Sequence, residues 1–138
     1  MIAVGPSGPG DAEAALCRDT RFLRAVQHFN CGDWYAAHDD FEELWHESAG
    51  LLRTLLQGLL QVAVGQLHHE RGNRRGATIL TGEGLGRLDQ APGQVVGLDL
   101  EALRREVRLW LQALQQESDP CALPPPSLHW VDSSMGTG

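Results

Sequence analysis

The sequence predicts an all-α fold, a compact up-and-down bundle of about five helices. Apolar residues recur at helical spacing through most of the chain, and no segment shows a convincing alternation of polar and apolar residues. The loops between the second, third and fourth helical segments are short, and short loops join antiparallel neighbours. No repeat period is visible, so an α-solenoid is disfavoured.

The first helix is expected from about Ala12 to Phe29, and the sequence Asn30-Cys31-Gly32 ends it. The second helix begins after Asp33, whose carboxylate is suited to cap free backbone N–H groups. Its apolar residues recur on one face, which we expect to enter the core. They are Trp34, Phe41, Leu44 and Trp45.

The third helix is expected from about Leu51 to Arg71, and Gly72 is a normal left-handed end. Its apolar residues point to almost every side, which predicts a central position. The fourth helix begins at Asn73 as N-cap. Glycines at positions 82, 84 and 86 each cost about 1 kcal/mol relative to alanine. Packing must therefore outweigh that cost, or the helix ends near Thr81.

The fifth helix has Asp99 as its N-cap and Glu101 in its first turn, where a negative charge favours the helix dipole. Outside the bundle domain, 11–117, we expect a flexible N-terminus at 1–10 and a Pro-rich, partly disordered tail at 118–138. The apolar Leu123, Leu128 and Trp130 leave open that the first part of this tail lies along the domain as an extended strap.

Composition restricts the partners and the compartment. A net charge of -7 argues against a nucleic acid duplex as partner, since such proteins usually carry a basic excess. The three cysteines, Cys17, Cys31 and Cys121, form no Cys-x-x-Cys pair and indicate no disulfide framework. Neither a signal peptide nor a membrane span is visible. We therefore expect a soluble, cytoplasmic protein without a membrane partner.

Polar residues at helical spacing mark a candidate ligand-binding site on the second and third helices. His38 and Glu42 border the aromatic face of the second helix. On the third helix Gln57, Gln61 and His68 lie within about 40° of one another at 100° per residue. If the turn is centred near Ala49, antiparallel pairing places Glu42 level with Gln57 and His38 level with Gln61. Most other acidic residues of the second helix, including Asp39 and Asp40, are expected on its solvated face.

Three interpretations of this polar stripe remain open. Its members can form a structural or ligand-lining hydrogen-bond network, or merely the wet face of the third helix. Alternatively, His38, Glu42 and His68 can hold a divalent metal ion, although the zinc-protease motif His-Glu-x-x-His is absent. We favour a non-catalytic module that binds a small ligand or protein partner in the groove between the second and third helices. The alternative function is a metal-dependent hydrolase.

A weaker candidate is an anion site at the start of the fourth helix. Arg71, Arg74 and Arg75 surround Asn73, where free backbone N–H groups and the helix dipole favour a negative charge. The alternative is a solvated turn without a ligand.

The same polar and glycine positions resemble an uncharacterised helical family, the domain of unknown function 309. The resemblance covers the elements Phe29-Asn30-x-Gly32, Ala37-His38-x-x-x-Glu42-x-x-Trp45, Gln57-Gly58-Leu59-x-Gln61, His68, Gly72-Asn73 and Gly76-Ala77. It implies a compact all-α bundle and carries no activity over to this chain. The sequence departs from the family pattern at Asp39, where glutamate is usual, and in its glycine-rich fourth helix.

Overall fold

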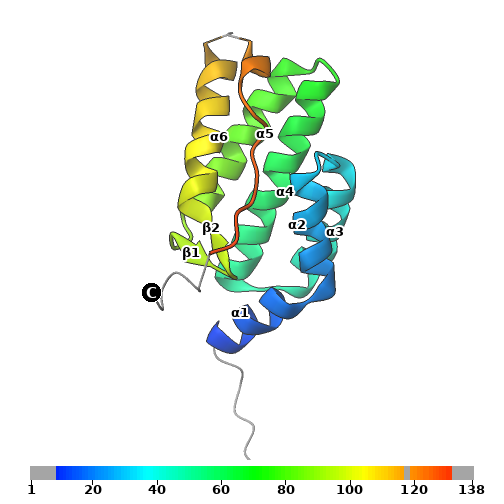
Figure 1. Ribbon diagram of the computed structural model, residues 1–138, viewed down its shortest axis with the longest axis vertical. Coiled ribbons are helices and arrows are strands. Elements are labelled where there is room, and N and C mark those ends of the chain that lie inside the picture. The colour runs from blue at the N-terminus through cyan, green and yellow to red at the C-terminus, as the bar shows by residue number, and fades with distance from the viewer. Residues whose placement is uncertain (1–8, 117–118, 132–138) are drawn as a thin grey trace, which may run out of the picture.

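Three long helices form one side of the bundle in the computed structural model, which describes residues 9–116 and 119–131. They are α4 (Gly50–Glu70), α5 (Arg74–Leu88) and α6 (Leu100–Gln115). The shorter pair α2 (Thr20–Asn30) and α3 (Trp34–Glu47) packs beside α4, and α1 (Pro9–Arg18) lies at one end of the bundle (Figure 1). Consecutive helices are packed neighbours from α2 to α6, so the predicted up-and-down helical bundle is confirmed.

The first predicted helix is in fact two helices, α1 and α2, separated at Asp19. Asp19 has an extended backbone, with φ -69° and ψ 125°, and its carboxylate accepts a hydrogen bond from the Arg21 N–H at 2.8 Å. An aspartate that caps a new helix competes with continuation of the preceding one. The apolar spacing continued across this break, and so the sequence pattern alone did not reveal it.

Helix α5 continues through Gly82, Gly84 and Gly86 to Leu88, because it packs closely on α4. A Cβ added to Gly84 would lie 2.9 Å from Val62 Cγ2 and 3.0 Å from the Gly58 carbonyl oxygen. The glycines at 58 and 84 thus allow the two backbones to approach each other. Packing of this helix pair outweighs the unfavourable helix propensity of glycine.

A short hairpin that the sequence pattern did not predict precedes α6. Strand β1 (Gln94–Val95) pairs antiparallel with β2 (Leu98–Asp99). The two residues between them, Val96 and Gly97, have positive φ angles of 50° and 77°, as a tight two-residue turn requires. With two residues each, these strands are too short to produce a visible alternation.

The described part of the tail, residues 119–131, packs on the domain as a strap after a single 3-10 turn, η1 (Pro120–Ala122). Asn30 donates from Nδ2 to the Leu128 carbonyl at 2.9 Å and accepts from the Leu128 N–H at 2.6 Å. The Trp110 indole N–H donates to the Pro124 carbonyl at 2.8 Å. Trp130 and Leu98 form an isolated antiparallel β-bridge. In Figure 1 the strap runs along the bundle beside α6.

The expectations of a flexible start and a disordered tail fall partly on residues 1–8, 117–118 and 132–138, which lie outside the described residues. Within the described ones, Pro9 and Gly10 already belong to α1. Residues 119–131 contact the bundle over several hydrogen bonds, and we therefore count them as part of the domain.

The core lies between the α2–α3 pair and the longer helices. Phe22 and Phe29 of α2 meet Phe41 edge to face, with ring centroids 6.2 and 6.4 Å apart. Trp34, also buried, donates its indole N–H to Glu70 Oε2 at 2.9 Å and so joins α3 to the end of α4. Cys17 and Cys31 are free thiols. No helix within the described ranges combines the length and the apolar character needed to cross a membrane.

Candidate functional site

The five residues of the predicted polar site lie at separate places instead of forming one network. His38 and Glu42 are on α3, Gln61 faces α5, and His68 lies near the turn from α4 to α5. Gln57 is half-buried on α4, and its side chain makes no hydrogen bond within the described parts of the chain. The predicted contacts of His38 with Gln61 and of Glu42 with Gln57 are therefore wrong.

Gln61 is buried between α4 and α5, where both ends of its amide are bonded. Its Nε2 donates to Glu83 Oε1 at 3.1 Å, and its Oε1 accepts from Arg87 Nη1 at 3.0 Å. The helical wheel grouped Gln61 with Gln57 and His68, and the predicted helix pairing directed this side of the helix toward α3; the neighbour of Gln61 is instead α5. The close approach at Gly58 and Gly84 brings α5 near enough to supply the partners.

A double-mutant cycle on Gln61→Leu and Arg87→Leu should show coupling, since each variant leaves the same buried hydrogen bond unmade. We expect a coupling energy of about 0.5–3 kcal/mol in chemical denaturation. The matched cycle of Gln61→Leu with His38→Leu should be additive within about 0.5 kcal/mol. Coupling in the second cycle instead of the first would restore the pairing of α3 with Gln61.

His68 takes part in the turn between α4 and α5. Its Nδ1 lies 3.0 Å from Asn73 Nδ2; because an amide nitrogen can only donate, Nδ1 is the acceptor. A Cβ on Gly76 would lie 2.6 Å from that Asn73 nitrogen, so this glycine leaves room for the pair. The predicted metal set of His38, Glu42 and His68 does not come together, because His68 is held at this turn.

Residues of the predicted anion site already bind protein groups. Asn73 accepts from the Gly76 N–H at 3.0 Å and caps α5. Arg74 donates from Nη2 to the carbonyls of Ala113 and Leu114, at 2.9 and 3.1 Å, at the end of α6. A cation favours the negative end of a helix dipole, so Arg74 joins α5 to α6. Arg71 and Arg75 are exposed.

The solvent-facing side of α3 carries a cluster of one imidazole and two carboxylates. His38 Nε2 lies 3.0 Å from Glu42 Oε2, and His38 Nδ1 lies 3.3 Å from Asp39 Oδ1. The His38 side chain is 25% exposed, Glu42 44% and Asp39 57%. Asp39 lies on the solvated face of α3, as expected, but its carboxylate also comes close to His38, which the sequence pattern did not predict. Successive helix residues diverge at Cβ, but the long His38 ring reaches its neighbour.

Asp40 was expected on the solvated face of α3, but it is only 8% exposed. Its carboxylate accepts from Arg24 Nε at 3.1 Å and Nη2 at 2.9 Å, which ties α3 to α2 and raises the pKa of the Arg24 guanidinium above its ordinary value. His28 Nε2 lies 3.8 Å from the same carboxylate. This contact depends on where α2 packs, and the pattern within α3 carried no signal for it.

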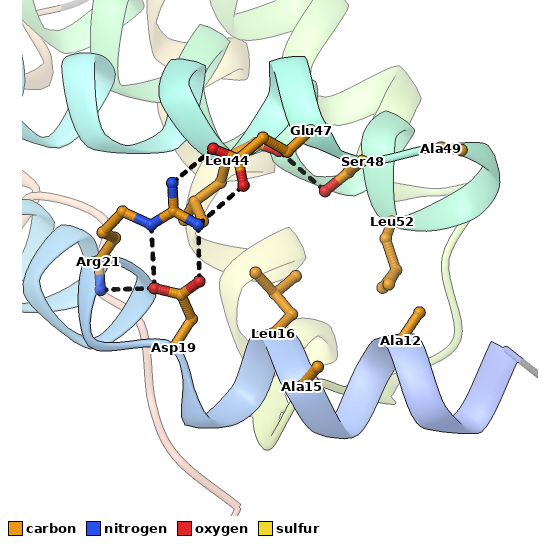
Figure 2. A pocket seen from close by; sticks show the side chains of 10 residues that line it. All are labelled: Ala12, Ala15, Leu16, Asp19, Arg21, Leu44, Glu47, Ser48, Ala49 and Leu52. Carbon is orange, nitrogen blue, oxygen red and sulfur yellow. Dashed lines mark hydrogen bonds and ion pairs between the residues drawn. The ribbon is translucent and has the colours of Figure 1, made fainter. Parts of the chain in front are cut away.

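A cleft of about 370 Å³ separates α1 from the turn between α3 and α4. Figure 2 shows Ala12, Ala15 and Leu16 of α1 facing Leu52 across it, with Asp19, Arg21 and Glu47 at one end. Leu44, Ser48 and Ala49 complete the lining. Sequence reasoning missed this cleft, because it forms only where α1 turns away from α2 at Asp19.

Arg21 organises the charges at the end of the cleft. It donates to Asp19 Oδ2 at 2.8 Å, to Glu47 Oε2 at 2.6 Å and to Glu43 Oε1 at 3.1 Å. These hydrogen bonds raise the pKa of Arg21 and hold the pKa values of Asp19 and Glu47 below their ordinary ones. Three carboxylates around one guanidinium leave a net charge of -2.

The family comparison agrees with the resemblance seen in the sequence. Residues 22–80 match the family model described as Domain of unknown function (DUF309), so the resemblance is confirmed over α2, α3, α4 and the first half of α5. No curated protein matches the chain.

Proposed function

Because the family model that residues 22–80 match describes a domain of unknown function, we propose a function from the geometry of this chain. The protein is a non-catalytic helical module that binds a small organic cation with an apolar body in the cleft between α1 and the α3–α4 turn. One observation carries this proposal: the cleft combines apolar walls with a carboxylate-rich end.

The apolar part of the cleft suits a small hydrocarbon body. Its volume of about 370 Å³ lies in the range of small-molecule sites, roughly 300–1,000 Å³. Small side chains at Ala12, Ala15 and Ala49 keep it open, while Leu16 and Leu44 form a buried floor. Each Å² of apolar surface removed from water contributes about 25 cal/mol, so an alkyl chain supplies most of the affinity.

The charged residues at the end of the cleft determine whether it binds a cation or an anion. Asp19, Arg21 and Glu47 at one end of the cleft carry a net charge of -1. Glu43, which binds Arg21 from outside the lining, adds a further negative charge, so this end attracts a cation and repels an anion. Arg21 does not reverse this preference, because its guanidinium is already bonded to three carboxylates. A ligand ammonium group can approach the carboxylate of Glu47, which lines the cleft and is largely exposed.

A binding function is favoured over the hydrolase alternative by the position of His68. A hydrolytic metal centre needs its protein ligands around one ion, with an open position for water or substrate. His68 is engaged by Asn73 at the α4–α5 turn, whereas His38 and Glu42 lie together on α3. The residues predicted for catalysis thus do not form the centre that the alternative requires.

Titration with hexylammonium, followed by amide chemical shifts, tests the proposal. We expect saturable shifts confined to residues 12–21 and 44–52, which contain the lining of the cleft. Hexanoate has the same apolar chain with the opposite charge and should bind more weakly. Equal shifts with both ligands, or no shifts in these two segments, would contradict the proposal.

Two variants separate the apolar and electrostatic contributions. Ala15→Leu fills the cleft and should abolish the hexylammonium shifts, while Glu47→Gln should weaken binding of the cation and leave hexanoate unaffected or improved. Glu101→Gln, on the exposed surface of α6, removes the same charge away from the cleft and should change neither. Far-UV circular dichroism checks that each variant retains its helices.

A further inference from the structure

The cluster on α3 is separate from the cleft and has a chemistry of its own. We propose that His38, Asp39 and Glu42 bind a divalent first-row transition-metal ion on the outer face of α3. This site differs from the one predicted from the sequence, since Asp39 takes the place of His68. The inference does not depend on the cleft or on its ligand.

The distances suit a shared ion. One ligand atom from each of the three side chains lies within 4.8 Å of the other two, and His38 Nε2 is 3.0 Å from Glu42 Oε2. Ligands bound at about 2.0–2.2 Å lie roughly 3 Å apart when they occupy neighbouring coordination positions. The imidazole and the Glu42 carboxylate therefore already have the spacing of two such ligands. Asp39 is the most exposed of the three, and a rotation of its side chain is enough to bring its carboxylate to the same ion.

The hydrogen-bonding capacity of His38 also calls for a cation. Both ring nitrogens face a carboxylate oxygen, at 3.0 Å from Glu42 and 3.3 Å from Asp39. A neutral imidazole has one N–H donor and one acceptor, and an ionised carboxylate only accepts. Neither contact has the geometry of a hydrogen bond, although both distances are short. A metal ion placed between the imidazole and the carboxylates would be bound by both kinds of group.

The three side chains are free to serve a ligand because they do not hold the fold together. Among the described residues, all ion pairs and hydrogen bonds of His38, Asp39 and Glu42 stay within α3. By contrast, Gln61 joins α4 to α5 and Asp40 joins α3 to α2. Binding an ion to this cluster requires no rearrangement of the helices.

The ligand set determines the class of ion. Imidazole suits transition metals such as Zn²⁺, while carboxylates also suit Mn²⁺; Mg²⁺ and Ca²⁺ prefer oxygen ligands alone. An ion bound by three side chains of one exposed helix face has its remaining coordination positions directed to solvent, where water can fill them. We therefore expect binding of Mn²⁺ and Zn²⁺ in preference to Mg²⁺ and Ca²⁺.

Mn²⁺ is the best probe because the free thiols Cys17 and Cys31 would compete for Zn²⁺. Paramagnetic Mn²⁺, added to the full chain at neutral pH, should broaden amide signals most strongly between residues 35 and 46. His38→Gln and Glu42→Gln should each weaken Mn²⁺ binding about tenfold or more, since even outer partners of a metal ligand contribute this much. Excess Mg²⁺ should not restore the lost signals.

The control variant is His129→Gln. His129 Nε2 lies 3.0 Å from Glu106 Oε2, so it is another exposed histidine–carboxylate pair. The third member of this group is the Ser127 hydroxyl, 3.1 Å from His129 Nε2, in place of a second carboxylate. Replacement of His129 should leave the broadening at residues 35–46 unchanged. Broadening that is spread over the acidic surface, or that is unchanged in His38→Gln, would overturn the proposal. Hexylammonium shifts in the same His38→Gln protein report separately on the cleft.

Discussion

A chain that ends at Ala122 should lose about 3 kcal/mol or more of unfolding free energy relative to the full-length protein. The deletion removes the strap, whose buried Leu128 alone is worth about 1.5–3 kcal/mol. It also removes the partners of Asn30 and Trp110, at about 0.5–1.5 kcal/mol for each hydrogen bond. Urea denaturation followed by circular dichroism measures the loss.

One control chain and one single variant test whether the loss comes from the strap. The chain that ends at Val131 retains all of the strap contacts described above and should match the full-length protein. The single variant Asn30→Ala leaves the strap in place but removes both hydrogen bonds to Leu128, and should cost about 1–3 kcal/mol. If the chain that ends at Ala122 were as stable as the one that ends at Val131, the strap would contribute nothing to the fold.

Gly84→Ala should destabilise the protein by about 1–3 kcal/mol, the usual effect of forcing extra volume into a packed interior. The new Cβ would meet Val62 Cγ2 at 2.9 Å and the Gly58 carbonyl oxygen at 3.0 Å. The second of these contacts is with backbone, so relief requires α4 and α5 to separate. Thermal or urea denaturation gives the magnitude.

Gly86→Ala is the matched control in the same helix. A Cβ at Gly86 has no heavy atom within 4 Å outside its own helical turn, and the position is exposed. Alanine is there a better helix former, and the variant should gain about 0.5–1 kcal/mol. If α5 packs closely on α4, alanine should lower the unfolding free energy at position 84 and raise it at position 86. Stabilisation by both substitutions would show that α5 does not approach α4 so closely.

The sequence by itself determined the local features of this fold. The N-cap side chains of Asn73 and Asp99 each accept from the backbone N–H group three residues further along the chain. Asp33 precedes α3 as predicted, but its side chain makes no such capping hydrogen bond. Gly32 and Gly72 have positive φ angles at the ends of α2 and α4, as predicted for Gly72. These interactions span at most a few residues, which is why composition and spacing were enough to predict them.

For the candidate sites, the sequence determined the position of each residue around its own helix but not its partner. The wheel placed Gln61 on the same side of α4 as Gln57 and His68 and the predicted pairing gave it His38 as partner, yet its partners Glu83 and Arg87 belong to α5. In the same way, Asp40 is buried only because Arg24 of α2 reaches it. A helical period describes directions about one axis and contains no information on which helix occupies each direction.

Tertiary structure alone decided three features: the cleft, the strap and the continuation of α5. The cleft depends on the turn at Asp19 that directs α1 across the α3–α4 turn, and the strap depends on Asn30 meeting Leu128, 98 residues further along the chain. Helix α5 continues because Gly84 fits against Gly58. In each case the free energy that stabilises the feature comes from contacts between segments far apart in sequence. Such contacts exist only once the helices have packed, so local propensity could not reveal them.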